Sequence, residues 1–270
     1  MPAIVRYESM FSTIEYIGKI TLDISKSYRD FFSLVLKIIA RIFDKKTYNS
    51  ASMNVLVNQI YFTSIRILPL FLGVSAVVGF LLIGIFFHVL NKVGLDEYLG
   101  QIIMGFIVTE LSPLITVLLI AFRSSSAMNA EIAVMKVSKE IDALKSFNID
   151  DISYLVLPRV ISGVIAVVLL SGIFSIVVLV SGFICSQLLF GMNLDVYANL
   201  LLSSAKISDI IIVLVKCSAF GFFITVIPIR YGLNASDDLT SIPVAILNGM
   251  VTVFRAIVII EVLTLIARSI

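Results

Sequence analysis

The chain has 270 residues, of which 59% are hydrophobic and 14% are charged, and its mean hydropathy is +1.08. Soluble domains contain roughly 45 to 50% apolar residues, so an ordinary soluble protein is excluded and most of the folded surface must face lipid. The net charge of +2 is too small to suggest a nucleic-acid partner. With two cysteines, one histidine and neither a Walker A nor a GxGxxG motif, we expect the chain itself to bind no metal or cofactor.

The N-terminal region, residues 1–66, contains a predicted amphipathic helix. From Met10 to Ile42, apolar residues recur at alternating steps of four and three, which places them on one helical stripe with charged residues between them. Such a helix suits the membrane interface, although the same spacing is also typical of a short coiled coil or a packing helix. The mixture of acidic and basic residues at the start of the chain is not typical of a cleaved signal or transit peptide.

Residues 67–270 are predicted to form a transmembrane domain of about five helices. The first, 67–90, is uncharged over 24 residues, or about 36 Å of helix, against a hydrocarbon core of about 30 Å. The third apolar run, 160–192, fits either one long helix or a span followed by a re-entrant segment. The other predicted spans are 102–122, 207–229 and 242–267. The predicted fold is therefore an all-α integral membrane protein.

The distribution of Lys and Arg predicts how the spans are oriented. The region before the first span has nine basic residues and the segment 123–159 has five, whereas the connections 91–101 and 191–206 have one each. Basic residues are retained on the cytoplasmic side during insertion. We therefore expect a multi-pass protein with its N-terminus and the segment 123–159 in the cytoplasm.

The segment 127–148 is predicted to be a short surface helix between two spans, with its apolar residues on a narrow stripe. A helix docked into a partner would transmit that partner's rigid-body motion to the spans attached at both ends. A solvated loop is the alternative interpretation. If the segment docks, the polar contacts would come from Glu140, Asp142 and Lys145 and the apolar ones from Ile141, Ala143 and Leu144.

Glu110 is the strongest functional candidate inside a predicted span. A charge at the centre of a membrane helix costs about 2.5 to 3.5 kcal/mol and usually faces a cavity or a partner. Pro113 would bend the helix near this carboxylate, because it cannot donate a backbone hydrogen bond. A structural ion pair is the alternative role for Glu110. For Lys216, Arg255 and Glu261 we expect mutual ion pairs or positions at an interface.

The run 109–159 contains a spaced series of motif residues: Glu110, Leu111 and Pro113, then Arg123, then Ala130, Glu131 and Met135, then Glu140, Ile141, Asp142, Ala143 and Leu144, and finally Pro158 and Arg159. This pattern resembles the MlaE-type permease family, the membrane subunits of ABC transporters that work with Mce-domain lipid carriers. The family usually has a basic residue and a glycine where this chain has Thr109 and Ser112. A second, weaker match contains Lys216, Phe220, Gly221, Tyr231 and Gly232.

The resemblance implies a homodimer in the bacterial inner membrane that binds two copies of a separate cytoplasmic ABC ATPase and a periplasmic Mce-domain lipid-binding protein. It implies that phospholipid is transported, and that ATP is bound and hydrolysed by the partner, so that the chain is not itself an enzyme. The implied lipid pocket at the dimer interface consists of Thr109, Glu110, Leu111 and Pro113. The residues implied in coupling to the ATPase are Glu131, Glu140, Ile141, Asp142, Ala143 and Leu144.

Two other classes of function are weighed against this interpretation. An ion- or proton-coupled secondary transporter would use Glu110 and Lys216 as the coupling charges, but five spans without an evident internal repeat argue against it. An intramembrane enzyme is disfavoured because the sequence offers no plausible catalytic set of side chains.

Overall fold

The structure is a computed structural model that describes residues 29–42 and 50–269. The chain divides into two compact units between Thr47 and Tyr48. In the first unit, residues 29–42 are helical, and Ile38 from the predicted apolar stripe is buried while Lys37 is exposed. The part of the predicted amphipathic helix that precedes residue 29 lies outside the described residues.

In the second unit, every regular element that the structure describes is a helix, and five helical stretches are long and apolar enough to cross a membrane. The prediction of five spans is therefore confirmed. The helices continue past the apolar runs into polar flanking residues, because hydropathy marks only the part of a helix that suits hydrocarbon. The five stretches are Met53–Val93, Leu99–Val137, Ile152–Phe190, Ile207–Leu233 and Ser241–Arg268.

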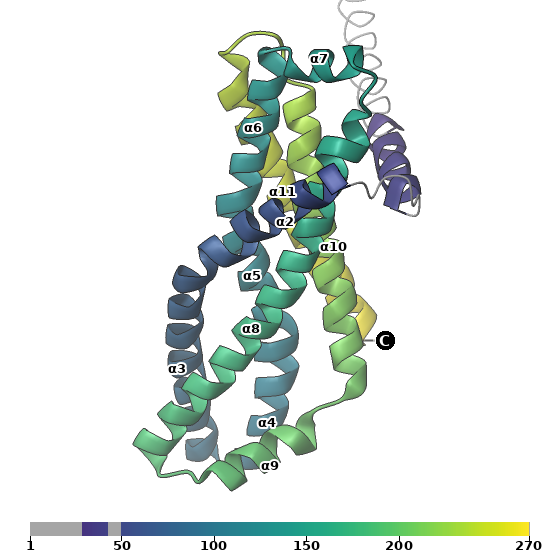
Figure 1. Cartoon of the computed structure of the whole chain (residues 1–270). Helices are drawn as coiled ribbons and strands as arrows, with labels where there is room; N and C mark the ends of the chain where they lie inside the picture. The colour runs from purple at the N-terminus through teal and green to yellow at the C-terminus, as the bar shows by residue number, and fades with distance from the viewer. Residues whose placement is uncertain (1–28, 43–49, 270) are drawn as a thin grey trace, which may run out of the picture. The chain divides into compact units, whose positions relative to one another are not determined.

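The first span begins with a bend. Helix α2 (Ser50–Ser64) continues through one 3₁₀ turn, η2 (Ile65–Ile67), into α3 (Leu68–Val93), which has a proline in its first turn. Proline is accepted there because the first turn of a helix leaves its N–H groups unpaired. Figure 1 shows α2 crossing the other helices obliquely before α3 turns along them. At its far end, α3 stops at Gly94, whose positive φ of 74° suits a residue without Cβ.

The second span is one continuous helix whose hydrogen bonding changes along its length. It contains α4 (Leu99–Ile102), α5 (Ser112–Ile120) and α6 (Ser126–Val137), joined by the π-helical segments η4 (Ile103–Leu111) and η5 (Ala121–Ser125). Pro113 lies in the first turn of α5, directly after η4. The missing proline N–H is thus accommodated by a local change of helix type.

The third span is one long helix, not a span followed by a re-entrant segment. Helix α8 (Leu157–Phe190) is a single helix of 34 residues and follows directly on the π-helical segment η6 (Ile152–Val156). At 1.5 Å per residue α8 is about 51 Å long, so it exceeds the hydrocarbon thickness. It packs along α3 and along α10 (Ile207–Leu233). At the α10 contact, a Cβ added to Gly221 would lie 2.5 Å from the Val164 Cα, so only glycine permits this approach.

The two ends of the unit are marked by short helices, α7 (Glu140–Ser146) and α9 (Leu194–Ser204), which lie at opposite ends of the spans in Figure 1. We refer to these as the α7 end and the α9 end. Tyr197 links α9 to α8, because its hydroxyl donates to the Leu179 carbonyl at 3.0 Å. Burial raises the pKa of this phenol above its ordinary value. The last span is α11 (Ser241–Ser269), which packs on α10 and α6.

Candidate functional site

An ion cluster of four side chains, Glu110, Lys216, Glu261 and Arg268, lies among three spans. Lys216, on α10, is only 1% exposed, and its ammonium donates to both carboxylates. It reaches Glu110 Oε2 on one side and Glu261 Oε1, at 2.9 Å, on the other. These contacts join the second, fourth and fifth spans at a point where an unpaired charge would be costly.

Arg268 completes the cluster from the last turns of α11. Its Nη1 donates to Glu110 Oε1 at 3.0 Å and to Thr109 Oγ1 at 2.6 Å, and also to the Gly105 carbonyl. The cluster therefore contains two cations and two carboxylates, and a third carboxylate, Asp209 on α10, lies at its edge, 3.8 Å from Arg268 Nη2. Removing one member of such a buried group leaves an uncompensated charge, which is far more costly than the intact group.

Two successive residues of the π-helical segment η4 both face this interior. Thr109 and Glu110 are 3% and 6% exposed, although neighbours in a regular α-helix point about 100° apart. A π-helical turn changes the direction of the side chains that follow it and is frequently found at functional sites. The Thr109 hydroxyl donates back to the Gly105 carbonyl, so both its donor and its acceptor functions are used.

The residues after Glu110 in the predicted lipid pocket pack against α8. Leu111 is half-buried, while Ser112 and Pro113 are buried. The Ser112 hydroxyl donates to the Ser171 carbonyl at 2.9 Å and accepts from Ser175 Oγ at the same distance. Within one copy of the chain, the segment from Thr109 to Pro113 thus joins the ion cluster to the packing of the third span.

The predicted coupling segment is divided into two parts rather than forming one surface helix. Its first half belongs to α6, the end of the second span, and α7 follows after a break at Ser138 and Lys139. Lys139 takes the left-handed conformation, with φ of 61°, which ends one helix and redirects the chain. The Ser138 hydroxyl donates to Glu140 Oε1 at 2.9 Å across this break. The break could not be read from the sequence because it contains neither glycine nor proline.

Helix α7 presents only part of its predicted contact surface. Ile141 is buried within the chain, so it is not available to a partner, whereas Asp142 and Ala143 are exposed and Leu144 is half-buried. Phe147, directly after α7, is 76% exposed. This ring was not among the predicted coupling residues, although a large apolar residue beside a polar helix is a recognisable signal.

Glu131, also predicted for coupling, is bound to another motif residue. Its carboxylate accepts from Arg159 Nη2 at 2.7 Å, and Arg159 is only 3% exposed. A second nitrogen of that guanidinium, Nη1, donates to the Leu155 carbonyl at 2.9 Å. Glu131 therefore neutralises a buried cation at the start of α8, whatever its further contacts are.

Comparison with known proteins agrees with this architecture. The model of the family "Permease MlaE" matches residues 56–267, which include almost all of the five spans. The chain belongs to the MlaE permease family. It is a permease subunit and thus a transport protein rather than a catalytic enzyme, and membership of an ABC permease family implies an ATPase partner.

Relatives of this MlaE-family permease come from bacteria and from plastids. A probable ABC transporter permease protein of Synechocystis sp. is 30% identical over 61% of this chain and 62% of its own length. A probable ABC transporter permease protein of Rickettsia conorii is 26% identical over 81% of this chain and 83% of its own length. The chloroplastic protein TRIGALACTOSYLDIACYLGLYCEROL 1 of Arabidopsis thaliana is 30% identical over 54% of this chain and 42% of its own length.

Two features of the site were not predicted from the sequence. Arg268 was placed in no site, because its distance of 158 positions from Glu110 gives no sign of contact. Arg255, for which an ion pair or an interfacial position was expected, is exposed and lies outside the ion cluster, so the sequence did not separate it from Lys216 and Glu261. A charge near the end of an apolar run looks the same in sequence whether it turns inward or outward.

Proposed function

We propose that this permease subunit moves phospholipid between the bacterial inner membrane and a periplasmic Mce-domain carrier, driven by a separate cytoplasmic ATPase. The observation that carries the proposal is the family match over the five spans. The Arabidopsis relative is named for a galactolipid, which supports a lipid as the class of substrate. In this proposal the chain binds no ATP, and ATP is bound and hydrolysed by the partner.

The α7 end of the molecule is suited to the ATPase. Glu140 and Asp142 are exposed on α7, and Phe147 beside them offers an apolar anchor. Because α7 follows α6 after a break of only two residues, a displacement of α7 by the partner would act directly on the second span. That span carries Glu110, so nucleotide-driven motion at the α7 end could reach the interior of the permease.

A homodimer is proposed because α11 is buried on one side only. It contributes Glu261 and Arg268 to the ion cluster, while apolar residues such as Val258 and Val262 are exposed along it. In the proposed dimer, a lipid pocket between the two copies adjoins the segment from Thr109 to Pro113, of which only Leu111 is partly exposed within one copy, so the pocket would open when the spans separate. Alternating exposure of this pocket to the two sides of the membrane would be the transport step.

The proposed orientation places the α7 end and the N-terminus in the cytoplasm and the α9 end toward the periplasm. The basic residues support it, with five in the segment 123–159 and only one in 191–206. In this orientation, α7 faces the ATPase and the surface around α9 faces the Mce-domain protein.

The first test is native mass spectrometry of the full chain, extracted gently from its host membrane, with bound subunits and bound lipid measured together. We expect a dimer that carries two ATPase copies, an Mce-domain protein and phospholipid. A particle that lacks the ATPase in several mild detergents would contradict the proposal.

A charge reversal at each end then tests the assignment of partners. The double variant Glu140→Lys, Asp142→Lys should lose the ATPase while inserting normally. The matched variant Glu97→Lys, Asp195→Lys reverses two exposed charges at the α9 end and should retain it. Full retention of the ATPase by the first variant would remove α7 from the coupling surface.

A secondary transporter is the second candidate, because Glu110 and Lys216, its expected coupling charges, are in direct contact. It predicts lipid or solute transport that persists when the ATPase is removed and stops when the ion gradient is dissipated. The ABC permease predicts the opposite dependence, so proteoliposomes with and without the ATPase distinguish the two.

A further inference from the structure

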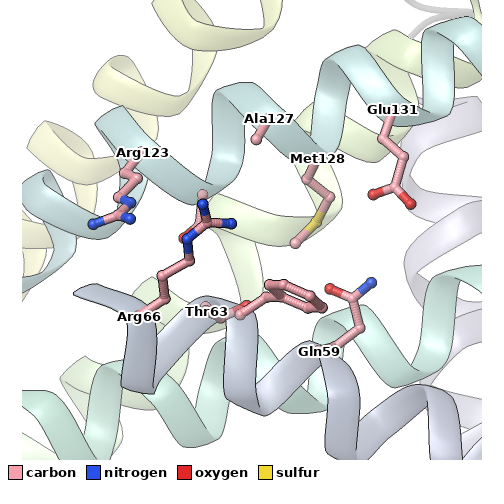
Figure 2. A pocket seen from close by; sticks show the side chains of 9 residues that line it. Gln59, Thr63, Arg66, Arg123, Ala127, Met128 and Glu131 are labelled. Atoms are coloured by element: carbon pink, nitrogen blue, oxygen red, sulfur yellow. The ribbon is translucent and has the colours of Figure 1, made fainter. Parts of the chain in front are cut away.

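A pocket that the proposed function does not use lies between the start of the first span and the end of the second. Its volume is about 510 Å³, within the range of about 300 to 1,000 Å³ that is typical of small-molecule sites. One wall is formed by α2 and η2, and the other by η5 and α6 (Figure 2). The side chains that line it include Gln59, Phe62, Arg66, Arg123, Met128 and Glu131.

Two guanidinium groups lie together at one end of this pocket. In Figure 2 the side chains of Arg66 and Arg123 lie toward this end of the pocket, and those of Gln59 and Glu131 lie toward the other. Neither arginine forms a salt bridge with a carboxylate among the residues that the structure describes. Glu131 does not balance them, because its charge is already offset by Arg159. The pocket therefore has a positive end that an anion would stabilise.

The position of the two arginines along their helices indicates where this anion comes from. Arg66 immediately precedes the first apolar run, and Arg123 immediately follows the second. Their neighbours Ile65 and Phe122 are 53% and 63% exposed, so apolar surface adjoins each charge. Both guanidinium groups thus lie where hydrocarbon gives way to the polar interface, the depth at which a phospholipid carries its phosphate.

We propose that this pocket binds the phosphodiester headgroup of a glycerophospholipid, with Arg66 and Arg123 holding the phosphate. Gln59 and Glu131 would then face the amine or hydroxyl groups of the headgroup, and Phe62 and Met128 its apolar part. The pocket is separate from the predicted lipid segment at Glu110. Its role as an entry site for the cargo rests on the proposed function, whereas the binding itself can be tested alone.

The absence of tryptophan from the chain allows a local reporter of binding. In full-length Phe62→Trp protein in detergent, titration with dihexanoyl phosphatidylethanolamine should give a saturable change in fluorescence. Dihexanoylglycerol, which lacks the phosphate, should give none, and inorganic phosphate should bind far more weakly. Equal binding of inorganic phosphate would mean that the site belongs to the free ion, and would overturn the proposal, as would an equal response to dihexanoylglycerol.

Removing both guanidinium groups tests their assignment. On the Phe62→Trp background, Arg66→Gln with Arg123→Gln should weaken the phospholipid affinity at least about tenfold, because charged hydrogen bonds to phosphate are lost. Lys136→Gln with Lys139→Gln removes the same charge near the end of α6 outside the pocket and should change the affinity less than about twofold. Unaltered affinity in the arginine variant would exclude the site. If that variant does not fold, Arg66→Lys should still weaken binding, because an ammonium lacks the planar fork of a guanidinium.

The two proposals fail in different ways. If wild-type complexes transfer phospholipid but binding does not depend on Arg66 and Arg123, this site is wrong and the proposed function stands. If phospholipid binds in an arginine-dependent way but the complex with the ATPase moves no lipid, the site stands and the proposed function is wrong.

Discussion

The ion cluster around Glu110 and the pocket between Arg66 and Arg123 both bring together charged side chains from distant parts of the chain, but they differ in charge balance and in access. In the cluster, Lys216 is buried and each cation donates to a carboxylate. In the pocket, the two arginines are exposed and unpaired with any carboxylate among the described residues. The cations of the cluster are thus paired within the protein, whereas the arginines of the pocket would be paired by a bound anion.

The difference in pairing and burial indicates that the charges of the cluster contribute to stability and that those of the pocket contribute to binding. Charges that satisfy one another within the fold resist change, because removing any one leaves a buried charge without a partner. Charges that remain open to solvent cost little to remove from the fold, but their removal eliminates a binding contact. Four sets of variants, taken from the largest expected effect to the smallest, test whether the two regions divide in this way.

Breaking the cluster at its centre should have the largest effect. Lys216→Met keeps the length of the side chain but leaves Glu261 without a cation, and should destabilise the protein by about 3 to 5 kcal/mol. Thermal unfolding followed by circular dichroism in one fixed detergent measures the loss. Lys206→Met, which removes an exposed lysine just before the same helix, is the control and should change stability by less than about 0.5 kcal/mol. Equal stability of the two variants would show that the cluster does not hold the spans together.

A second change in the same cluster should restore part of this loss. In Lys216→Met with Glu261→Gln, the charges left in the cluster are the Glu110 carboxylate and the Arg268 guanidinium, which still donates to it. The double variant should therefore be more stable than Lys216→Met alone, with a coupling energy of about 1 to 3 kcal/mol from a double-mutant cycle. Strictly additive effects would mean that Lys216 and Glu261 act independently, contrary to their contact at 2.9 Å.

Glu131 lies between the two kinds of region and should give an intermediate effect. Its carboxylate is half-exposed on the pocket side, but it pairs with the buried Arg159. Glu131→Gln keeps a hydrogen-bond acceptor and loses the charge, so we expect a cost of about 1 kcal/mol after allowance for solvent screening. Glu140→Gln, an exposed carboxylate bonded only to the Ser138 hydroxyl, serves as the control. Equal unfolding temperatures for the two would contradict the structural role of Glu131.

The spans could be predicted from the sequence because hydropathy and helix length follow from the bilayer itself. The apolar run 67–90 was recognised by composition alone, and it lies within the first observed span. What composition could not give was the interior: whether the run 160–192 was one helix, and which way each charge inside a span would turn. Those answers depend on packing, such as the close contact at Gly221, which is not visible in one helix at a time.

For the candidate site, sequence reasoning identified the individual charges but not their partners. Glu110 was singled out because of its depth, and Lys216 and Glu261 were expected either to pair, as they do, or to lie at an interface. Arg268 was missed because it comes at the end of an apolar run, where a basic residue usually marks the interface. Arg66 was counted only toward orientation. Arg66 and Arg123 line the same pocket because α2 and η2 lie across it from η5 and α6, a tertiary arrangement that the sequence of neither segment shows.

The smallest effect on stability is expected for the arginines of the pocket, and a small effect there would indicate that they serve binding and not the fold. In lipid-free detergent, Arg66→Gln with Arg123→Gln should change the free energy of unfolding by less than about 0.5 kcal/mol, because neither arginine pairs with a carboxylate in the part of the chain that the structure describes. Added phospholipid should stabilise the wild type, since a ligand that binds only the folded state raises its unfolding temperature with concentration, and this increase should be reduced in the variant. A large loss without lipid would instead show that the arginines are part of the fold, like the cluster. The two measurements distinguish a charge that stabilises the fold from one that binds a ligand, because only removal of a ligand-binding charge reduces the stabilisation that added phospholipid gives.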